Sequence, residues 1–331
     1  MFMNTKFKKK SMTVSGFVGP LIAAVLVAVI VGFTTDRFWS LGNLNNLPLA
    51  VSITALMAIG STLVIFTGGI DLSIGSMIAL ITMAMATLIK IEGWPVIAGL
   101  LFAVILGAIL GAFNGLFSAY LKVPSFIATL AGLSIFKGMA YLFNNGSPIF
   151  SIAKNFEVFF YGKMFGIIPL PLIYVAIFYI FFALFMNYSK LGREIYAVGG
   201  NEVAAKLSGI NVKKVKFITF VIAGAMAGVA SVLMASRLNS GSPNYGSGME
   251  LSAIAAAVIG GASLLGGRGN IINTLLGALI IIIVQNGLNL NAVPTSLQSI
   301  TIGVIILIAV LIDMWKTDIA ELFKRYFKKE A

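Results

Sequence analysis

The chain offers few side chains that could do chemistry, because its 331 residues include no Cys and no His. Their absence removes thiolate nucleophiles, imidazole bases and the usual zinc ligands. The sequence also lacks the Gly-x-x-x-x-Gly-Lys-Ser/Thr and Gly-x-Gly-x-x-Gly loops that bind nucleotide phosphates. We therefore predict that the chain is not an enzyme, has no catalytic residue, no metal site and no bound cofactor, and does not hydrolyse ATP itself.

The few charged side chains near apolar segments are the remaining candidates. Asp71 and Glu250 lie at the ends of apolar runs, and no carboxylate lies well inside one. Ion-coupled transporters usually keep an acidic or His side chain within the membrane, so these positions favour an energy source on another polypeptide. Lys137 is the one charge inside a predicted span, where it either snorkels to the surface or donates to a hydroxylated solute. The candidate translocation pathway is therefore Asp71, Ser73, Lys137 and Glu250.

The elements that must position these residues are membrane spans. Hydrophobic residues make up 59% of the chain and charged residues only 10%, against about half and a quarter in soluble domains. A hydrocarbon core about 30 Å thick needs roughly 20 helical residues. We predict an all-α membrane protein, with residues 1–331 forming one transmembrane domain. The uncharged runs predict ten helices, near 15–35, 47–67, 72–90, 94–120, 124–143, 167–188, 217–236, 251–267, 271–290 and 297–315.

The distribution of Lys and Arg predicts the orientation. With ten spans, 17 basic residues fall on the side of the two termini and five on the other side. The positive-inside rule then places both termini in the cytoplasm. The first apolar run is longer than a signal-peptide core and nine spans follow it, so we expect it to remain as an anchor. The net charge of +12 does not indicate nucleic acid, because the basic residues lie between apolar runs.

Two halves of the chain carry similar short motifs. Gly69 to Ser73 (Gly-Ile-Asp-Leu-Ser) resembles Gly248 to Ser252 (Gly-Met-Glu-Leu-Ser). The predicted topology turns the first copy toward the cytoplasm and the second outward, which predicts an inverted repeat of the kind that lines transporter pathways. Chance similarity between apolar segments is the alternative. Two further pairs follow in the same order: Asn114-Gly115 with Asn286-Gly287, and Val123-Pro124-Ser125 with Val293-Pro294-Thr295.

The loop at 189–216, predicted to be cytoplasmic, contains a short helix. Gly199 and Gly200 are expected to break the chain, Asn201 is a good N-cap and Gly209 a plausible C-cap. Val203 and Leu207 then share one face. A helix this short is not stable alone in water, so it either docks into a groove on a partner or packs against its neighbours. From these residues alone, a solvated connector remains the alternative.

Glycines at two further places carry predictions about packing. Gly107, Gly111 and Gly115, with Gly224 and Gly228, have the four-residue spacing that lets helices approach closely. The glycines between residues 260 and 269 bracket the short eighth span. They favour equally a broken helix that lines a cavity and simple packing.

Several longer motifs resemble one family. They are Thr67 to Ser76, Val123 to Leu130, Tyr196 to Ile210, Gly248 to Gly261 and Gly266 to Gly269. In this order they resemble the permease subunits of bacterial ABC importers for simple sugars, the ribose permease family, over about residues 15–315. Ser252 departs from the pattern, since relatives often carry Asp there; we expect little consequence for the fold.

The resemblance implies an assembly in the bacterial cytoplasmic membrane. Two permease copies would pair with two ATP-binding subunits, which hold the ATP and magnesium, and would receive solute from an extracytoplasmic sugar-binding protein. Lys137-Gly138 lies where the family often has a basic residue followed by Gly, which favours a functional role for Lys137. The loop residues implied to contact the ATPase are Gly199, Gly200, Asn201, Glu202, Ala204, Ala205, Lys206, Leu207 and Gly209.

Three functions remain to be compared. The favoured one is the permease subunit of an ATP-driven importer for ribose or a related monosaccharide. An ion-coupled secondary transporter of a small polar solute is the alternative, and the inverted repeat is its only support. A membrane enzyme or passive channel is disfavoured by the missing catalytic groups and the elaborate loop at 189–216. We expect the sugar to be selected largely by the binding protein.

Overall fold

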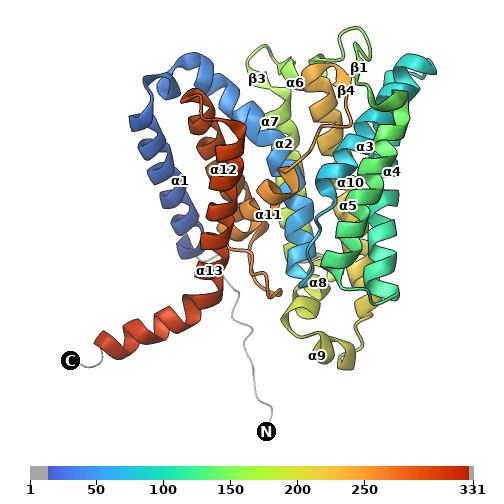
Figure 1. Ribbon diagram of the computed structural model, residues 1–331. Coiled ribbons are helices and arrows are strands. Elements are labelled where there is room, and N and C mark those ends of the chain that lie inside the picture. Colours follow the sequence, from blue (N-terminus) through green and yellow to red (C-terminus); the bar gives the residue numbers. More distant parts are fainter. Residues whose placement is uncertain (1–13, 328–331) are drawn as a thin grey trace.

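The computed structural model describes the backbone from Val14 to Phe327 and the side chains of residues 17–314. Within this part, nine helices are long and apolar enough to cross a membrane, and they stand side by side in Figure 1. The predicted all-α membrane fold is confirmed. The nine are α1 (Val14–Thr34), α2 (Leu41–Phe66), α3 (Ile74–Ala86, extended by a π-helical turn Thr87–Ile91), α4 (Val96–Gly115), α5 (Ser125–Leu142), α7 (Leu170–Tyr188), α10 (Val212–Leu238), α12 (Ile271–Leu290) and α13 (Thr295–Phe327).

The eighth predicted span was wrong in its extent. Only Met249–Ile259 is helical there (α11), and its 11 residues are too few to cross the hydrocarbon core. The chain continues through irregular backbone in which Gly261, Gly266, Gly267 and Gly269 have positive φ, so the helix ends where glycine conformations begin. The helix is broken here, as one reading of these glycines predicted, and Gly260 and Gly267 also pack closely against neighbouring backbone, as the other did.

Short elements lie at the two ends of the bundle (Figure 1). At one end, β1 (Ile149–Phe150) pairs with β4 (Ser240–Gly241), and β2 (Lys163–Met164) pairs with β3 (Ile168–Pro169), close to α6 (Val158–Tyr161). At the other end lie α8 (Lys190–Gly200) and α9 (Glu202–Leu207). We call these ends the α6 side and the α9 side. Single helical turns also form at Asp36–Trp39, Leu116–Tyr120 and Phe143–Gly146.

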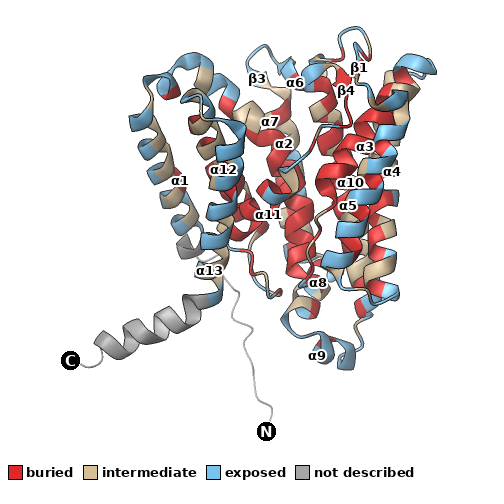
Figure 2. Ribbon diagram, viewed as in Figure 1, coloured by how far each residue is buried: buried red, intermediate tan, exposed pale blue. Residues whose placement is uncertain are grey.

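Helix α2 is the centre of the bundle. Every residue from Val51 to Phe66 is buried, and α7, α10, α11 and α12 pack against it. Figure 2 shows this buried core against the exposed outer helices. On α1 and α13 large apolar side chains are exposed, such as Ile30 (62%) and Leu307 (60%). So large an apolar surface fits contact with lipid and not with water.

The predicted glycine contacts are present between α4 and α10. A Cβ on Gly107 would overlap the carbonyl oxygen of Gly224, and a Cβ on Gly228 would come within 2.5 Å of the carbonyl oxygen of Ala103. The two backbones therefore touch directly, because no side chain separates them.

The two repeat copies form equivalent structures in opposite orientations. Irregular segments lead into α3 and α11. The Val-Pro motifs precede α5 and α13, and these two helices begin at opposite ends of the bundle (Figure 1). In the first copy Asn114 Nδ2 donates to Ser73 Oγ at 2.7 Å. In the second, Gln285 Nε2, one residue before the matching Asn286, donates to Ser252 Oγ at 3.1 Å. An amide on the next spanning helix thus holds the serine of each acidic motif, which supports an inverted repeat over chance similarity.

Candidate functional site

The short helix α9 is capped as the sequence predicts. Asn201 Oδ1 accepts the N–H of Ala204 at 2.9 Å, and Gly209 ends the turn with φ +82°. Val203 and Leu207 are 70% and 84% exposed on one face. Ala204 is also exposed, whereas Ala205 is buried against the bundle. The helix therefore presents an apolar face that nothing in the described chain covers.

Helix α8 corrects one prediction, because Gly199 and Gly200 do not break the chain but form its last turn. A Cβ on Gly199 would overlap the carbonyl oxygen of Phe66 and lie 2.5 Å from the N–H nitrogen of Gly267. That N–H donates to Phe66 O at 3.0 Å. We call this meeting of Phe66, Gly199 and Gly267 the junction. It joins the end of α2, the end of α8 and the segment that follows α11.

Tyr196 strengthens the junction from α8. Its hydroxyl donates to the carbonyl oxygen of Gly269 at 3.1 Å, and its ring lies 4.9 Å from the Phe66 ring, centroid to centroid. Burial raises the pKa of Tyr196 to about 12, so the hydroxyl remains a neutral donor at physiological pH. Both contacts tie α8 to the broken segment after α11.

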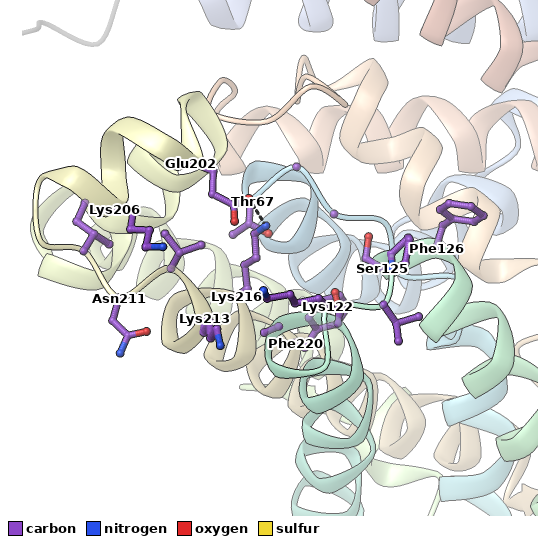
Figure 3. Close-up of a pocket in the computed structure, with 18 of the residues that line it drawn as sticks. Thr67, Lys122, Ser125, Phe126, Glu202, Lys206, Asn211, Lys213, Lys216 and Phe220 are labelled. Carbon is purple, nitrogen blue, oxygen red and sulfur yellow. Dashed lines mark hydrogen bonds and ion pairs between the residues drawn. The ribbon is translucent and has the colours of Figure 1, made fainter.

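A cavity of about 1020 Å³ opens beside α9 on the same side of the bundle. Figure 3 shows Lys122, Lys206, Lys213 and Lys216 around it. Glu202 is the one carboxylate among its described lining residues, and its Oε2 pairs with Lys216 Nζ at 2.6 Å. We call this the basic groove. Its excess of cations makes the α9 side electropositive.

Asp71 lies between the end of α2 and the start of α3, as predicted, and it is only 1% exposed. Its Oδ1 accepts from the backbone N–H and the hydroxyl of Ser73, at 2.9 and 2.7 Å. Together with the bond from Asn114 to Ser73, these contacts form a buried polar cluster. The burial of this carboxylate comes from its contacts with the bundle, and it lies outside the nine apolar helices of the described chain.

The irregular backbone before α3 is held by α5. Ile70 N–H donates to Ser125 Oγ and Leu72 N–H to Thr129 Oγ1, both at 3.1 Å. Within a membrane, backbone groups released from a helix need such partners, because no water is available to replace them. Ser125 of the Val-Pro-Ser motif and Thr129 thus stabilise the irregular segment 67–73. We call this segment the first broken crossing, and the irregular segments on either side of α11 the second.

Lys137 and Glu250 face the second broken crossing. Lys137 Nζ donates to the carbonyl oxygen of Pro243 at 2.6 Å, in the segment that leads into α11, so this side chain does not simply snorkel. Glu250 lies in the first turn of α11 beside α3, where a Cβ on Gly75 would overlap its Oε2. The structure therefore brings Asp71 and Ser73 into one cluster and places Lys137 and Glu250 around the start of α11.

A second cavity, of about 490 Å³, lies on the α6 side and was not predicted from the sequence. It lies among α2, α10, α11, α12 and α13, and five of its lining residues carry amides. In the sequence, three amides at one end of an apolar span could have indicated this cavity: Gln285, Asn286 and Asn289. We call it the amide cavity; its amide side chains are those of Asn46, Gln285, Asn286, Asn289 and Gln298.

In the part of the chain that the structure describes, nine apolar helices, two broken crossings and an inverted repeat are the features of a membrane transport protein. The chain belongs to the permease family described as branched-chain amino acid transport system / permease component, whose profile matches residues 43–310.

The chain is similar to several named permeases. The chain is 41% identical to the ribose import permease protein of Escherichia coli over 297 residues, which covers 88% of this chain and 92% of the relative. It is 34% identical to the xylose transport system permease protein of Haemophilus influenzae (93% and 98% covered). It is 35% identical to the D-allose transport system permease protein of E. coli (88% and 89% covered). No solved structure matches the chain.

The junction generates a prediction with a matched control. Gly199→Ala should destabilise the contact between α8 and Phe66, since overpacking costs about 1–3 kcal/mol. Gly200→Ala should have little effect, because nothing lies within 4 Å of its added Cβ. Limited trypsin digestion of the purified protein, with cleavage after Lys206 as readout, should show faster cleavage in the first variant only. Equal rates in the two variants would mean that close packing at Gly199 does not hold α8 in place.

Proposed function

We propose that the chain is the permease subunit of an ATP-driven importer that moves ribose or a related monosaccharide across the bacterial cytoplasmic membrane. The observation that carries this proposal is α9: a capped helix with an uncovered apolar face, joined through α8 to both broken crossings. The sequence has no nucleotide-binding loop of its own, so force has to arrive from another protein. The solute class is drawn from relatives named for ribose, xylose and allose.

The α9 side is the cytoplasmic side in this proposal. The four lysines of the basic groove support it, because Lys and Arg concentrate on the cytoplasmic side of membrane proteins. Both termini then lie in the cytoplasm. ATPase subunits, with their ATP and magnesium, bind over α8 and α9, so that Ala204, Val203 and Leu207 contact them. Gly199, Gly200, Asn201 and Gly209 shape the segment, Glu202 and Lys206 lie beside the groove, and Ala205 anchors α9 to the bundle.

Coupling follows from the junction. When the ATPase subunits close, α9 and α8 are displaced, and the junction transmits the displacement to the end of α2 and to the segment after α11. The first turns of α3 and α11 contact each other at Gly75, Gly246 and Glu250. Movement of α11 therefore changes its packing against α3, and the pathway switches between outward and inward access.

The solute pathway follows the broken crossings. Asp71 and Ser73 hold the first break in shape, while Lys137 and Glu250 lie at the second. A sugar-binding protein delivers solute at the α6 side and supplies the affinity, so contacts within the permease are weak. A second permease copy pairs with the exposed faces of the bundle to complete the transporter.

Reconstitution tests the function and the ATPase contact together. Proteoliposomes with the permease, its co-purified ATPase and its binding protein should take up D-ribose only when ATP is supplied, whether or not a protonophore is present. Ala204→Arg should reduce uptake at least about tenfold and weaken ATPase association, since a buried charge at an interface costs several kcal/mol. Ala204 is the better site than Ala205, whose burial would make a charge there disrupt α9 itself.

Two controls and two contrary outcomes complete this test. Ser147→Arg, at an exposed position on the α6 side, should leave ATPase association intact. Uptake that persists without ATP but collapses with the protonophore would establish the ion-coupled alternative. Normal ATPase association of Ala204→Arg would remove α9 as the contact.

Lys137 yields a separate prediction about the pathway. Lys137→Met removes the donor to Pro243 O and should lower ATP-dependent uptake several-fold, with ATPase association unchanged. Lys137→Arg, which keeps a cation and donors, should retain more activity. Initial uptake rates in the same proteoliposomes measure both. Wild-type uptake by Lys137→Met would make the lysine dispensable for transport.

A further inference from the structure

We infer that the amide cavity is a low-affinity binding site in the permease itself for an uncharged polyhydroxylated solute. The inference rests on the proposed function for the identity of that solute as a sugar. It assigns to this chain a contact with the solute that is separate from capture by the binding protein.

The lining chemistry selects the ligand class. Amide groups contain both N–H donors and a carbonyl acceptor, and they match sugar hydroxyls, which donate and accept. Among its described lining residues, Arg237 is the one charged side chain and there is no carboxylate. A cation would therefore find no counter-charge. Apolar side chains that can contact the C–H faces of a sugar ring are interspersed: Leu47, Met249, Ile282 and Ile302.

The amides are held in place before any ligand arrives. Gln298 Nε2 donates to Asn289 Oδ1 and to Val293 O, both at 2.9 Å. Asn286 Nδ2 donates to Asn43 Oδ1 at 2.7 Å, and Asn43 Nδ2 donates to Asn286 Oδ1 at 3.0 Å. Side chains fixed in this way lose little freedom when they bind. The volume of about 490 Å³ is within the range of small-molecule sites.

The position of the cavity connects it to the moving parts. Gln285 reaches Ser252 on α11, and Ser252 itself lines the cavity. Since α11 continues into the segment that ends at the junction, displacement of α9 would change the spacing of these groups. The cavity therefore binds solute more tightly in one state of the transporter than in the other, which is the condition for a ligand to be released by a conformational change.

The natural absence of Cys allows a direct test. Thr295→Cys and Ser299→Cys place single thiols in the cavity and leave its amides intact, and Ser147→Cys places one on the α6 side outside it. The purified permease, without ATPase or binding protein, is labelled with a membrane-impermeant maleimide in the presence of D-ribose or of KCl at equal osmolarity. With ribose at about four times its Kd, labelling in the cavity should slow about fivefold, because the free fraction falls to one fifth. Labelling at the control position should not change.

The outcomes separate this inference from the proposed function. Equal labelling with and without D-ribose and D-xylose at both cavity positions, in variants that elute as folded protein, would overturn the binding site even if ATP-dependent uptake is observed. Protection in the cavity without any ATP-dependent uptake would support the site and remove the importer function. Gln285→Leu gives a second measurement, with an expected fall in uptake rate of at least about fivefold; an unchanged rate counts against the site.

Discussion

The structure depends on how a membrane protein can leave its helices without leaving backbone groups unpaired. In the hydrocarbon region each released N–H or C=O needs a protein partner. The first break is paired by Ser125 and Thr129, which accept N–H groups from the segment before α3. The second is closed by the bond from Gly267 N–H to Phe66 O. Because these partners come from other elements, each break is joined to a neighbour, and in the proposed coupling these contacts transmit movement from one place to another.

Glycine makes the second of these connections possible. At Gly199 the backbone of α8 contacts the end of α2 with no side chain between them, so a displacement of α8 is not absorbed by rotamer changes. Direct backbone contact also joins α4 to α10, at Gly107 and Gly224. The direct backbone contacts thus lie between helices and at the junction, while α9 is the exposed element to which we propose that a partner binds.

Much of this could be predicted from the sequence, because hydropathy and charge depend on local composition. Nine of the ten predicted spans, the repeat motifs and the caps of α9 at Asn201 and Gly209 match the part of the chain that the structure describes. What no local pattern showed concerns segments whose structure depends on distant partners. Asp71 lies beside an apolar run as predicted, but its burial depends on hydrogen bonds among Asp71, Ser73 and Asn114. The residues after Ile259 are apolar enough for a helix, but their glycines and the bond to Phe66 favour an irregular course. The amide cavity was missed because its lining residues come from five helices whose arrangement no local pattern reveals.

The central claim is that α9 and the segment after α11 move as one unit through the junction. Spin labels at Leu207→Cys and Leu265→Cys, both exposed positions, can be compared with a third at Ser147→Cys in the assembled transporter. Pulsed electron–electron double resonance then gives the distances between the labels, without nucleotide and with ATP bound. The account predicts that ATP changes the distance from residue 265 to residue 147 while the distance from 207 to 265 stays the same. A change confined to the distance from 207 to 265 would show that α9 moves independently of the broken helix, and would contradict the account.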